Sequence, residues 1–386
     1  MCACFYILPG KESTGFSRIM LLLKSAFGLL HFAKYLQMMK LYCVIILLVF
    51  YSHFLEAQSI QRLRAEIQHG FIISHASDLK PVSDNRPTGF HVSWQRMGLG
   101  QNHWEICNCF YYIGAQFSWL NFGDRDILGD AYTLAGTFEP VLWRYNQWSL
   151  SLNSGIGATW LTKVHHPENN PLNNFFSSRL SFLLYVAPAI EYRFSDNWSG
   201  RLSANYNHIS NGGRKQPNRG MNYPQVGIGV NYYLNNEVLP DYERQHPGNE
   251  YLFWIESGFT TRKVDDENNR KPSVALVGGV NRAVSAFNGL GFGAEYNHDF
   301  SMLNESGNYG VHLLAPFISH HFIFGKFDFS QRMSWYAVQP EQLSSHNFYQ
   351  RYVITYKVFS GLRMGFSLKS HGHVATNIDF RMGWEF

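Results

Sequence analysis

Apolar and polar residues alternate along most of this chain in segments of about ten residues, the length that a tilted strand needs to cross a bilayer. The C-terminal segment shows the pattern best. One face of an extended chain there carries Phe386, Trp384, Met382, Phe380 and Ile378, and the other carries Glu385, Arg381, Asp379 and Asn377. A buried strand of a soluble sandwich rarely places three charges on its second face, whereas a membrane barrel with a polar lumen requires such residues. The pattern therefore predicts an all-β fold, a transmembrane antiparallel outer-membrane β-barrel.

Segments with this alternation recur often enough to predict about sixteen strands, within a range of roughly 12 to 16, an even number as in single-chain bacterial barrels. We expect them near residues 63–75, 88–97, 110–121, 128–142, 147–162, 179–194, 198–210, 224–235, 250–262, 273–285, 290–301, 309–324, 326–338, 348–359, 361–370 and 374–386.

The polar segment Asn235–Glu250, which holds Pro240 and Pro247, separates the first eight expected strands from the last eight. We interpret it as a long loop within one barrel, with a boundary between two small barrels as the less favoured alternative. A ring of sixteen strands would be wide enough for an aqueous channel.

Composition excludes several other classes of protein. Aromatic residues make up 16% of the chain, as many as the charged residues, and 45% of the residues are hydrophobic, which is enough to build a folded protein. The mean hydropathy is −0.21, and after the N-terminal segment no apolar run reaches the roughly eighteen residues of a membrane-spanning helix. A net charge of +4 without a basic cluster excludes a nucleic-acid binder.

The first 57 residues do not belong to the predicted barrel. Met39 and Lys40 open a short positive region, Leu41–Leu55 is apolar, and Ala57 provides a small residue at a cleavage site. We interpret residues 1–57 as a signal peptide, with Met1–Gln37 an over-extended gene start, and residues 58–386 as the barrel. A single membrane anchor at Leu41–Leu55 is the alternative.

Cysteine residues offer little chemistry in the mature chain, where only Cys107 and Cys109 remain. Two-residue spacing strains a disulfide within one strand, so we expect free thiols or a strained pair without a catalytic role. No further thiolates exist to complete a metal site with them.

The seventh expected strand breaks the alternation. Leu202, Ala204 and Tyr206 mark its lipid-facing side, and the period of two places His208 and Ser210 on that side as well. Polar side chains are costly in lipid. A histidine beside a serine is a base beside a nucleophile, the pair that hydrolyses esters through an acyl-enzyme. The position of the pair implies a lipid substrate.

The residues of this segment carry a family resemblance. His208-Ile209-Ser210-Asn211-Gly212, followed by Pro217-Asn218-x-Gly220-x-Asn222, resembles the HxSN(G/A)…PNxG segment of PagL-type lipid A 3-O-deacylases, also called acyloxyacyl hydrolases, in their larger Bacteroidetes-like form. The similarity covers residues 58–235, like an eight-stranded deacylase barrel, and is weaker over residues 236–386, which would supply additional strands. It extends to Gly70–His75, Ile127–Gly129, Asn169–Ser178 and Leu368–His371.

The resemblance implies roles for six residues. His208 would be the general base and Ser210 the nucleophile, while Asn211 with the backbone of Gly212 and Gly213 would form the oxyanion hole. The family's third catalytic residue is a Glu on the following strand, and Asn222 stands at the matching position. An amide can orient an imidazole, but it stabilises the imidazolium less than a carboxylate does.

Other polar groups are weaker candidates. His371 and His373 lie on the polar face of a late strand, where a metal site is conceivable but lumenal residues need no such purpose. Asn169, Asn170, Asn173 and Asn174 lie around two prolines and most simply form a loop, with binding of the lipid A sugar as the alternative.

The sequence thus predicts an outer-membrane hydrolase that removes a 3-O acyl ester from lipid A or lipopolysaccharide without metal or cofactor. One alternative is a porin or transport barrel whose deacylase-like half is inactive. The presence of Asn222 where the family has a Glu supports this alternative. The other is an outer-leaflet phospholipase, which would use the same Ser–His chemistry.

Overall fold

The structure is a computed structural model, and it describes residues 59–212, 215–244, 248, 250–264, 269–285, 287–304, 306–343, 345–372 and 374–386. The predicted signal peptide, Gly213 and His373 lie outside these residues. Among the residues described, no helix combines the length and the apolar character that crossing a membrane would take.

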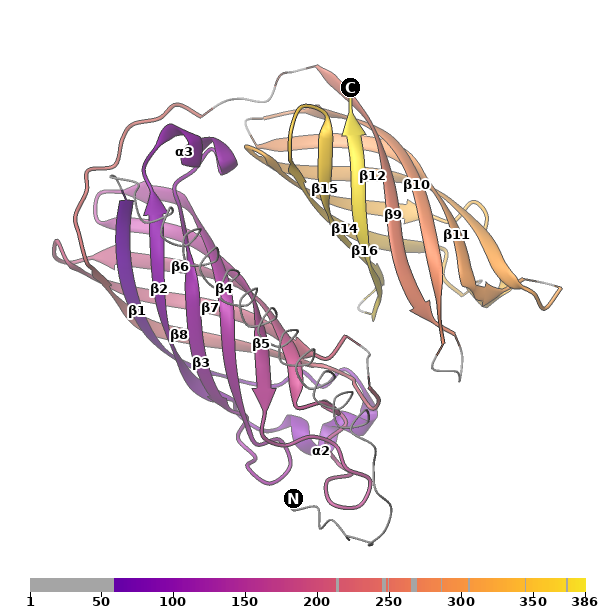
Figure 1. Ribbon diagram of the computed structural model, residues 1–386, viewed down its shortest axis with the longest axis horizontal. Coiled ribbons are helices and arrows are strands. Elements are labelled where there is room, and N and C mark those ends of the chain that lie inside the picture. The colour runs from indigo at the N-terminus through magenta and orange to yellow at the C-terminus, as the bar shows by residue number, and fades with distance from the viewer. Residues whose placement is uncertain are drawn as a thin grey trace, which may run out of the picture. The chain divides into compact units, whose positions relative to one another are not determined.

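The first eight strands close into a barrel of their own, the N-terminal barrel, in which β1 pairs with β2 on one side and with β8 on the other (Figure 1). All neighbours are antiparallel. The strands are β1 (Ser59–Gly70), β2 (Thr88–Gly98), β3 (Tyr111–Asn121), β4 (Asp130–Tyr145), β5 (Trp148–Leu161), β6 (Leu180–Arg193), β7 (Trp198–Ser210) and β8 (Met221–Tyr233).

The last eight strands form the C-terminal barrel, which closes where β16 pairs with β9. They are β9 (Tyr251–Lys263), β10 (Arg270–Ala283), β11 (Asn288–Leu303), β12 (Tyr309–Phe324), β13 (Phe327–Trp335), β14 (Phe348–Lys357), β15 (Leu362–His371) and β16 (Val374–Glu385). The fold class and the sixteen strands are therefore as predicted. The favoured single ring is wrong, because Asn235–Glu250 lies between two closed barrels.

The alternation of the sequence becomes an inside and an outside of each barrel. On β16, Ile378, Met382 and Trp384 are exposed to the lipid side, whereas Asp379 and Arg381 are buried in the lumen. An eight-stranded barrel has an interior just wide enough for its own side chains. The wide aqueous ring on which the channel alternative depends is consequently not formed.

Paired charges fill the lumen of the N-terminal barrel. The carboxylate of Glu139, which has no exposed surface, forms ion pairs with Arg62, Arg64 and Arg201 at 2.9, 2.8 and 2.8 Å. Arg201 also pairs with Glu66 at 3.0 Å. Because a buried charge is tolerated only when it is paired and hydrogen-bonded, these contacts hold β1, β4 and β7 in one register.

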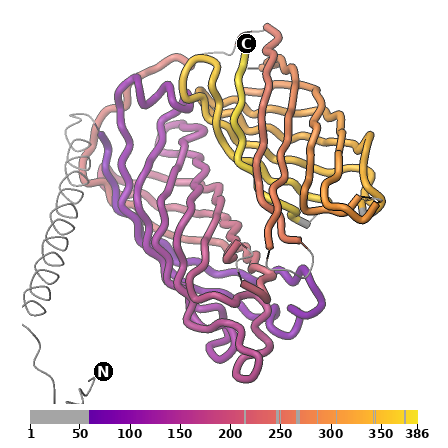
Figure 2. Tube along the Cα trace, turned by 45° about the vertical axis from the view of Figure 1, so that its right-hand side comes forward, coloured from indigo at the N-terminus to yellow at the C-terminus, as the bar shows by residue number. Residues whose placement is uncertain are grey.

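The two longest connections of the N-terminal barrel lie at one end, and the two shortest lie at the other. Residues 71–87 and 162–179 form long loops that gather at one end (Figure 2), whereas residues 146–147 and 194–197 make short turns at the other. The first loop carries η1 (Ser77–Leu79) and α2 (Lys80–Ser83); in the C-terminal barrel, η2 (Glu341–Leu343) lies between β13 and β14. Since bacterial barrels have short periplasmic turns and longer extracellular loops, the end with the long loops faces outward.

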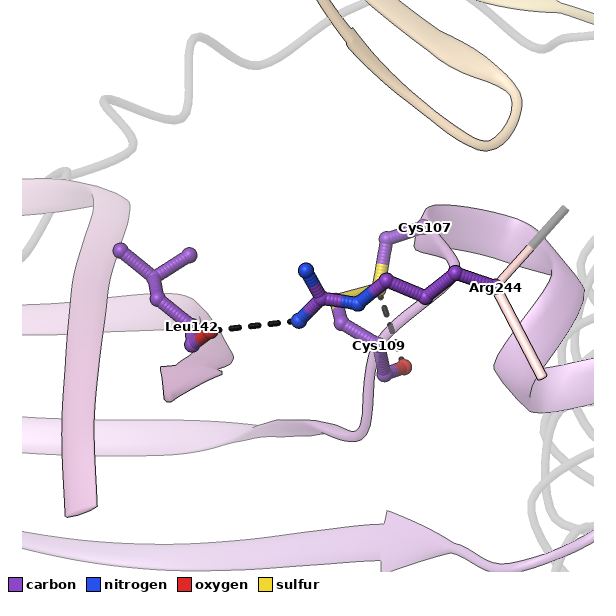
Figure 3. The surroundings of a disulfide bond; sticks show 4 residues. All are labelled: Cys107, Cys109, Leu142 and Arg244. Carbon is purple, nitrogen blue, oxygen red and sulfur yellow. Dashed lines mark hydrogen bonds between the residues drawn. A yellow bond between two sulfur atoms is a disulfide. The ribbon is translucent and has the colours of Figure 1, made fainter. Parts of the chain in front are cut away.

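The periplasmic end of the N-terminal barrel carries α3 (Gln101–Cys107) and a disulfide between Cys107 and Cys109 (Figure 3). The two cysteines do not share a strand, because Cys107 ends the helix and Asn108 adopts a left-handed conformation with φ of 51°. The expected obstacle to a bond within one strand is therefore absent.

The segment after β8 packs back onto this periplasmic end. Tyr242 donates a hydrogen bond to the carbonyl of Leu99 at 2.9 Å, and its ring lies 5.7 Å from that of Trp104. Arg244 donates to the carbonyl of Leu142 at 3.3 Å, as Figure 3 shows. Residues that follow β8 thus pack onto the N-terminal barrel.

The ion pairs of Glu139 generate the first prediction. The Glu139→Gln variant keeps the side-chain volume but leaves three guanidinium groups without their shared carboxylate, and removing one member of a buried ion pair costs about 3–5 kcal/mol. We expect the free energy of unfolding to fall by about that amount in urea titrations of the detergent-solubilised protein, followed by tryptophan fluorescence. The control is Leu134→Ala on the lipid-facing side of the same strand. An unchanged urea midpoint in Glu139→Gln would contradict this account.

Candidate active site on the outer wall of the N-terminal barrel

The outward end of β7 carries two polar residues on the lipid-facing wall. Leu202 and Tyr206 on this face are 51% and 46% exposed, and Asn205 and Asn207 on the opposite face are buried in the lumen. His208 and Ser210 continue the outward face and are half-buried. The regular strand therefore places both residues where its period of two predicts them.

His208 is held by the neighbouring strand. It lies opposite Asn222 in the β7–β8 register, and its Nδ1 lies 2.7 Å from Oδ1 of Asn222. An amide oxygen only accepts hydrogen bonds, so Nδ1 carries the proton and Nε2 remains the basic nitrogen. Val226 and Ile228, exposed further along β8, share the outward face with Asn222. The structure thus brings together His208, Ser210 and Asn222 on one face.

Gly220 leaves space for the side chains of His208 and Ser210. Its φ is +66°, and a Cβ atom there would lie 2.9 Å from Cε1 of His208 and 3.3 Å from Cβ of Ser210. Glycine is needed twice over, because other residues rarely adopt this φ and because any side chain would press on the imidazole. Gly220, the glycine of the PNxG motif, accordingly sets the distance between the loop and the imidazole of His208.

The loop after Ser210 is fixed by Asn211, which is 1% exposed. Its side-chain nitrogen donates to Oγ of Ser177 and to the carbonyl of Lys215, both at 3.0 Å. Its backbone N–H donates to Oδ1 of Asn218 at 3.2 Å. Gly212 follows with a φ of +67° and open space beside it, and Gly213 lies outside the described residues. Asn211 therefore shapes the loop that presents the next backbone N–H groups.

The loop of residues 162–179 supports the site from one side. The carbonyls of Asn174 and Phe175 accept hydrogen bonds from the backbone of Arg219 and Gly220 at 3.1 and 3.3 Å. The side-chain nitrogens of Asn170 and Asn173 both donate to the carbonyl of Ile127 at 2.9 Å. Two of the four predicted loop asparagines thus tie this loop to its neighbour.

The loop of residues 71–87 supports the site from the other side. The backbone N–H of Ile73 donates to the carbonyl of Asn222 at 2.9 Å. His75 lies with Nε2 at 3.1 Å from the carbonyl of Arg219, whose side chain pairs with Asp78 at 3.2 Å. Sequence reasoning missed Arg219 and Asp78, since exposed ion pairs between loops leave no periodic signal. His75 was named only within Gly70–His75, one of the segments similar to the family.

No group of three or more metal-ligating side chains occurs within the described residues. His371, a candidate ligand, instead has Nε2 at 3.0 Å from the Tyr336 hydroxyl and Nδ1 at 2.9 Å from the Thr376 hydroxyl. Its predicted companion His373 is not among the residues described.

Comparisons with known proteins agree on both halves of the chain. Residues 88–231 match the family model of lipid A 3-O-deacylase (PagL), and residues 249–386 match the model of the acyloxyacyl hydrolase C-terminal domain. No curated protein sequence matches the chain.

Solved structures with some similarity include an outer-membrane enzyme, a neisserial surface protein and a porin. The crystal structure of the outer membrane enzyme PagL is 14% identical, covers 43% of this chain and 97% of its own, and gives a TM-score of 0.33. Neisserial surface protein A is 11% identical over 45% of this chain and 96% of its own, with a TM-score of 0.30. A mutant porin of Rh. blastica is 12% identical over 85% of this chain and 99% of its own, with a TM-score of 0.21.

The contact of Gly220 with the imidazole generates the second prediction. Gly220→Ala should displace the His208 ring, and because a misplacement of about 1 Å can cost about 10²-fold in rate, labelling of Ser210 by an organophosphorus fluoride should slow by about that factor. The rate is measured by mass spectrometry of the labelled peptide. Gly307→Ala is the matched control, since Gly307 has a φ of +74° with open space around it. Equal labelling rates in the two variants would contradict the steric role of Gly220.

Proposed function

Because the chain belongs to the lipid A 3-O-deacylase (PagL) family, we propose that it is an outer-membrane hydrolase that cleaves a 3-O acyl ester of lipid A. Ser210 is the nucleophile, His208 the general base and Asn222 the residue that orients the base. The products are a free fatty acid and under-acylated lipid A. Residues 1–57 act as the signal peptide that directs the chain to the outer membrane.

One observation carries this proposal: the hydrogen bond between His208 and Asn222 lies on the lipid-facing wall, with Ser210 on the same face. Unpaired polar groups are costly beside hydrocarbon. A polar cluster on the lipid-facing wall of a barrel therefore indicates a function rather than a structural role. A substrate that is itself part of the outer leaflet reaches such a site by lateral diffusion. The ester bond of a lipid near the head groups lies at the corresponding depth.

The reaction proceeds in two steps with one base. Nε2 of His208 takes the Ser210 proton as Oγ attacks the ester carbonyl, and the same imidazolium then protonates the departing sugar hydroxyl. Water, deprotonated by His208, attacks the acyl-enzyme and releases the fatty acid and the serine. Asn222 keeps the proton on Nδ1 throughout both steps, so that Nε2 always faces the reaction.

The oxyanion that forms in each step needs donors within the loop that follows Ser210. We assign this role to Asn211, Gly212 and Gly213, with the backbone N–H groups of the two glycines as donors and the buried side chain of Asn211 holding the loop in place. Glycines suit this position, because the backbone can approach the developing charge without a side chain in the way.

Asn222 in place of the family's Glu predicts a slower enzyme rather than an inactive one. The amide fixes the tautomer as a carboxylate would, but it adds no negative charge to stabilise the imidazolium. A phospholipase of the outer leaflet would use the same residues, so substrate analysis is the test that separates the two activities.

The third prediction concerns the nucleophile and the substrate together. Lipid A from cells that express the wild-type chain should lose one hydroxyacyl mass, and lipid A from cells that express Ser210→Ala or His208→Ala should not, a fall in turnover of at least about 10³-fold. Mass spectrometry of lipid A and of phospholipids from the same cells is the measurement. The matched control is Ser203→Ala, a buried lumenal serine on the same strand. Full activity in Ser210→Ala would contradict the assignment, and loss of phospholipid acyl groups alone would favour the phospholipase.

The fourth prediction concerns the orienting residue. Asn222→Glu adds the negative charge that the family carries at this position, and we expect it to raise kcat by about tenfold, a difference of about 1.4 kcal/mol. Asn222→Leu keeps a similar size without an acceptor and should lower kcat by about 10²-fold or more. Rates of fatty acid release in detergent micelles distinguish these outcomes. If Asn222→Leu keeps the wild-type rate, Asn222 does not orient the base.

A further inference from the structure

The lumen of the C-terminal barrel contains a second serine–histidine pair, which the deacylase chemistry does not use. Ser319 and His321 lie two residues apart on β12, both facing inward, and are 5% and 2% exposed. Oγ of Ser319 lies 2.9 Å from Nε2 of His321. Nδ1 of the same ring lies 3.0 Å from both carboxylate oxygens of Asp328 on β13. The three side chains form a continuous Ser–His–Asp chain.

The carboxylate decides which nitrogen of His321 is basic. An ionised Asp328 only accepts hydrogen bonds, so Nδ1 of His321 must carry a proton and Nε2 must accept the hydrogen bond from the Ser319 hydroxyl. Arg363 lies 3.3 Å from the same carboxylate and favours its ionised form. This arrangement, with serine on Nε2 and carboxylate on Nδ1, is the one in which an imidazole activates a serine for attack.

An amide side chain, a group that can donate to an oxyanion, lies beside the serine. Asn281 on β10, Gly291 on β11 and Ser319 on β12 are successive partners across three strands. A Cβ atom on Gly291 would lie 2.8 Å from Oγ of Ser319 and 2.9 Å from Cβ of Asn281, so the glycine leaves space between the two side chains. The amide of Asn281 therefore borders the same space as the nucleophile, as an oxyanion donor must.

A small cavity adjoins the triad. Its volume is about 30 Å³, and its lining includes Asn281, His321, Asp328 and Trp254. Nε1 of Trp254 is buried without a hydrogen-bond partner, which is unusual because buried indole N–H groups generally find one. A cavity of this size holds a water molecule, and the unpaired donor provides a polar contact for what occupies it.

The cavity lies toward the periplasmic end of the lumen. His321 precedes the end of β12 by three residues, about 10 Å at the rise of a strand. The connection to β13 is the two-residue turn 325–326, and short turns mark the periplasmic side. The Ser319–His321–Asp328 group therefore lies nearer the periplasmic end of the lumen than the outward end.

We propose that Ser319, His321 and Asp328 form a second nucleophilic centre in the C-terminal barrel, whose serine reacts with small esters. His321 takes the Ser319 proton while Oγ bonds to the ester carbonyl carbon. The C–O bond to the alcohol then breaks, and the imidazolium protonates the departing oxygen. Water hydrolyses the acyl-serine with His321 again as base, and the products are a short-chain acid and an alcohol.

Covalent labelling of the full chain tests this proposal. In a Ser210→Ala background, the detergent-solubilised protein is treated with diisopropyl fluorophosphate, whose P–F bond breaks as the serine oxygen bonds to phosphorus and fluoride leaves. Peptide mass spectrometry should find the label on Ser319. His321→Gln should slow labelling by about 10²-fold or more, since the base is gone, and Asp328→Asn should slow it as well.

The matched control is Ser330→Ala. Ser330 lies in the same lumen, is 2% exposed and lines the same cavity, but the described hydrogen bonds connect it to Arg332 rather than to a histidine. Its replacement should leave labelling of Ser319 unchanged. Hydrolysis of p-nitrophenyl acetate should fall with Ser319→Ala and not with Ser330→Ala.

The outcomes separate this centre from the deacylase. Absence of label on Ser319 in correctly folded Ser210→Ala protein, judged by its heat-modifiable mobility, would overturn the proposal without affecting the role of Ser210. Equal labelling of Ser319 and Ser330 would also overturn it, because general reactivity of lumenal serines would then explain the result. Lipid A deacylation should be unchanged in Ser319→Ala.

Discussion

The paired charges of each lumen are the constraint on which both barrels depend. A ring of eight strands has no room for a water-filled channel, so inward charged side chains must pair with their neighbours. Glu139 meets this demand with three arginines from β1 and β7. In the C-terminal barrel, Arg351 pairs with Glu295, and Arg381 pairs with Glu256. A slip of one residue would turn these charges into lipid and bring apolar residues inside. The registers that position the reactive side chains are thus fixed by electrostatics in the lumen as much as by the apolar surface.

The same constraint gives meaning to polar residues on the outside. Along β7 and β8 the lipid-facing positions hold apolar residues or glycine as far as the outward end of the wall. There the polar residues His208, Ser210 and Asn222 occupy these positions. These residues face away from the lumen, and within the described part of the chain the hydrogen bond between His208 and Asn222 offsets part of the loss of water. Three loops meet there, and each contributes backbone or side-chain contacts to the residues that follow Ser210 or precede Asn222. The rigid wall positions the proposed base and nucleophile, and the loops surround them.

Periodicity explains what the sequence could predict. A period of two places each side chain on a face, so the positions of the strands, the charges of β16 and the common face of His208, Ser210 and Asn222 followed from the residues alone. Closure does not follow from periodicity, because β8 could pair with β9 as well as with β1 by any local criterion. The ring closes through contacts between residues far apart in the chain, such as the Arg62–Glu191 ion pair. The contact of Asn211 with Ser177 also joins residues far apart in the chain, and its contact with Lys215 lies within an irregular loop. Neither contact produces a periodic pattern from which the sequence could predict it. The bond between Cys107 and Cys109 depended on a helix end and one left-handed residue.

The two barrels place the same pair of residue types in opposite settings. In the N-terminal barrel, histidine precedes serine by two residues and both face outward; in the C-terminal barrel, serine precedes histidine by two residues and both face inward. On the wall an amide orients the imidazole, and in the lumen a carboxylate does so, with Arg363 beside it. The charge of Asp328 is compensated in the lumen by Arg363. On the wall, the neutral Asn222 fixes the tautomer of His208 without supplying a counter-charge to the imidazolium that the proposed reaction forms.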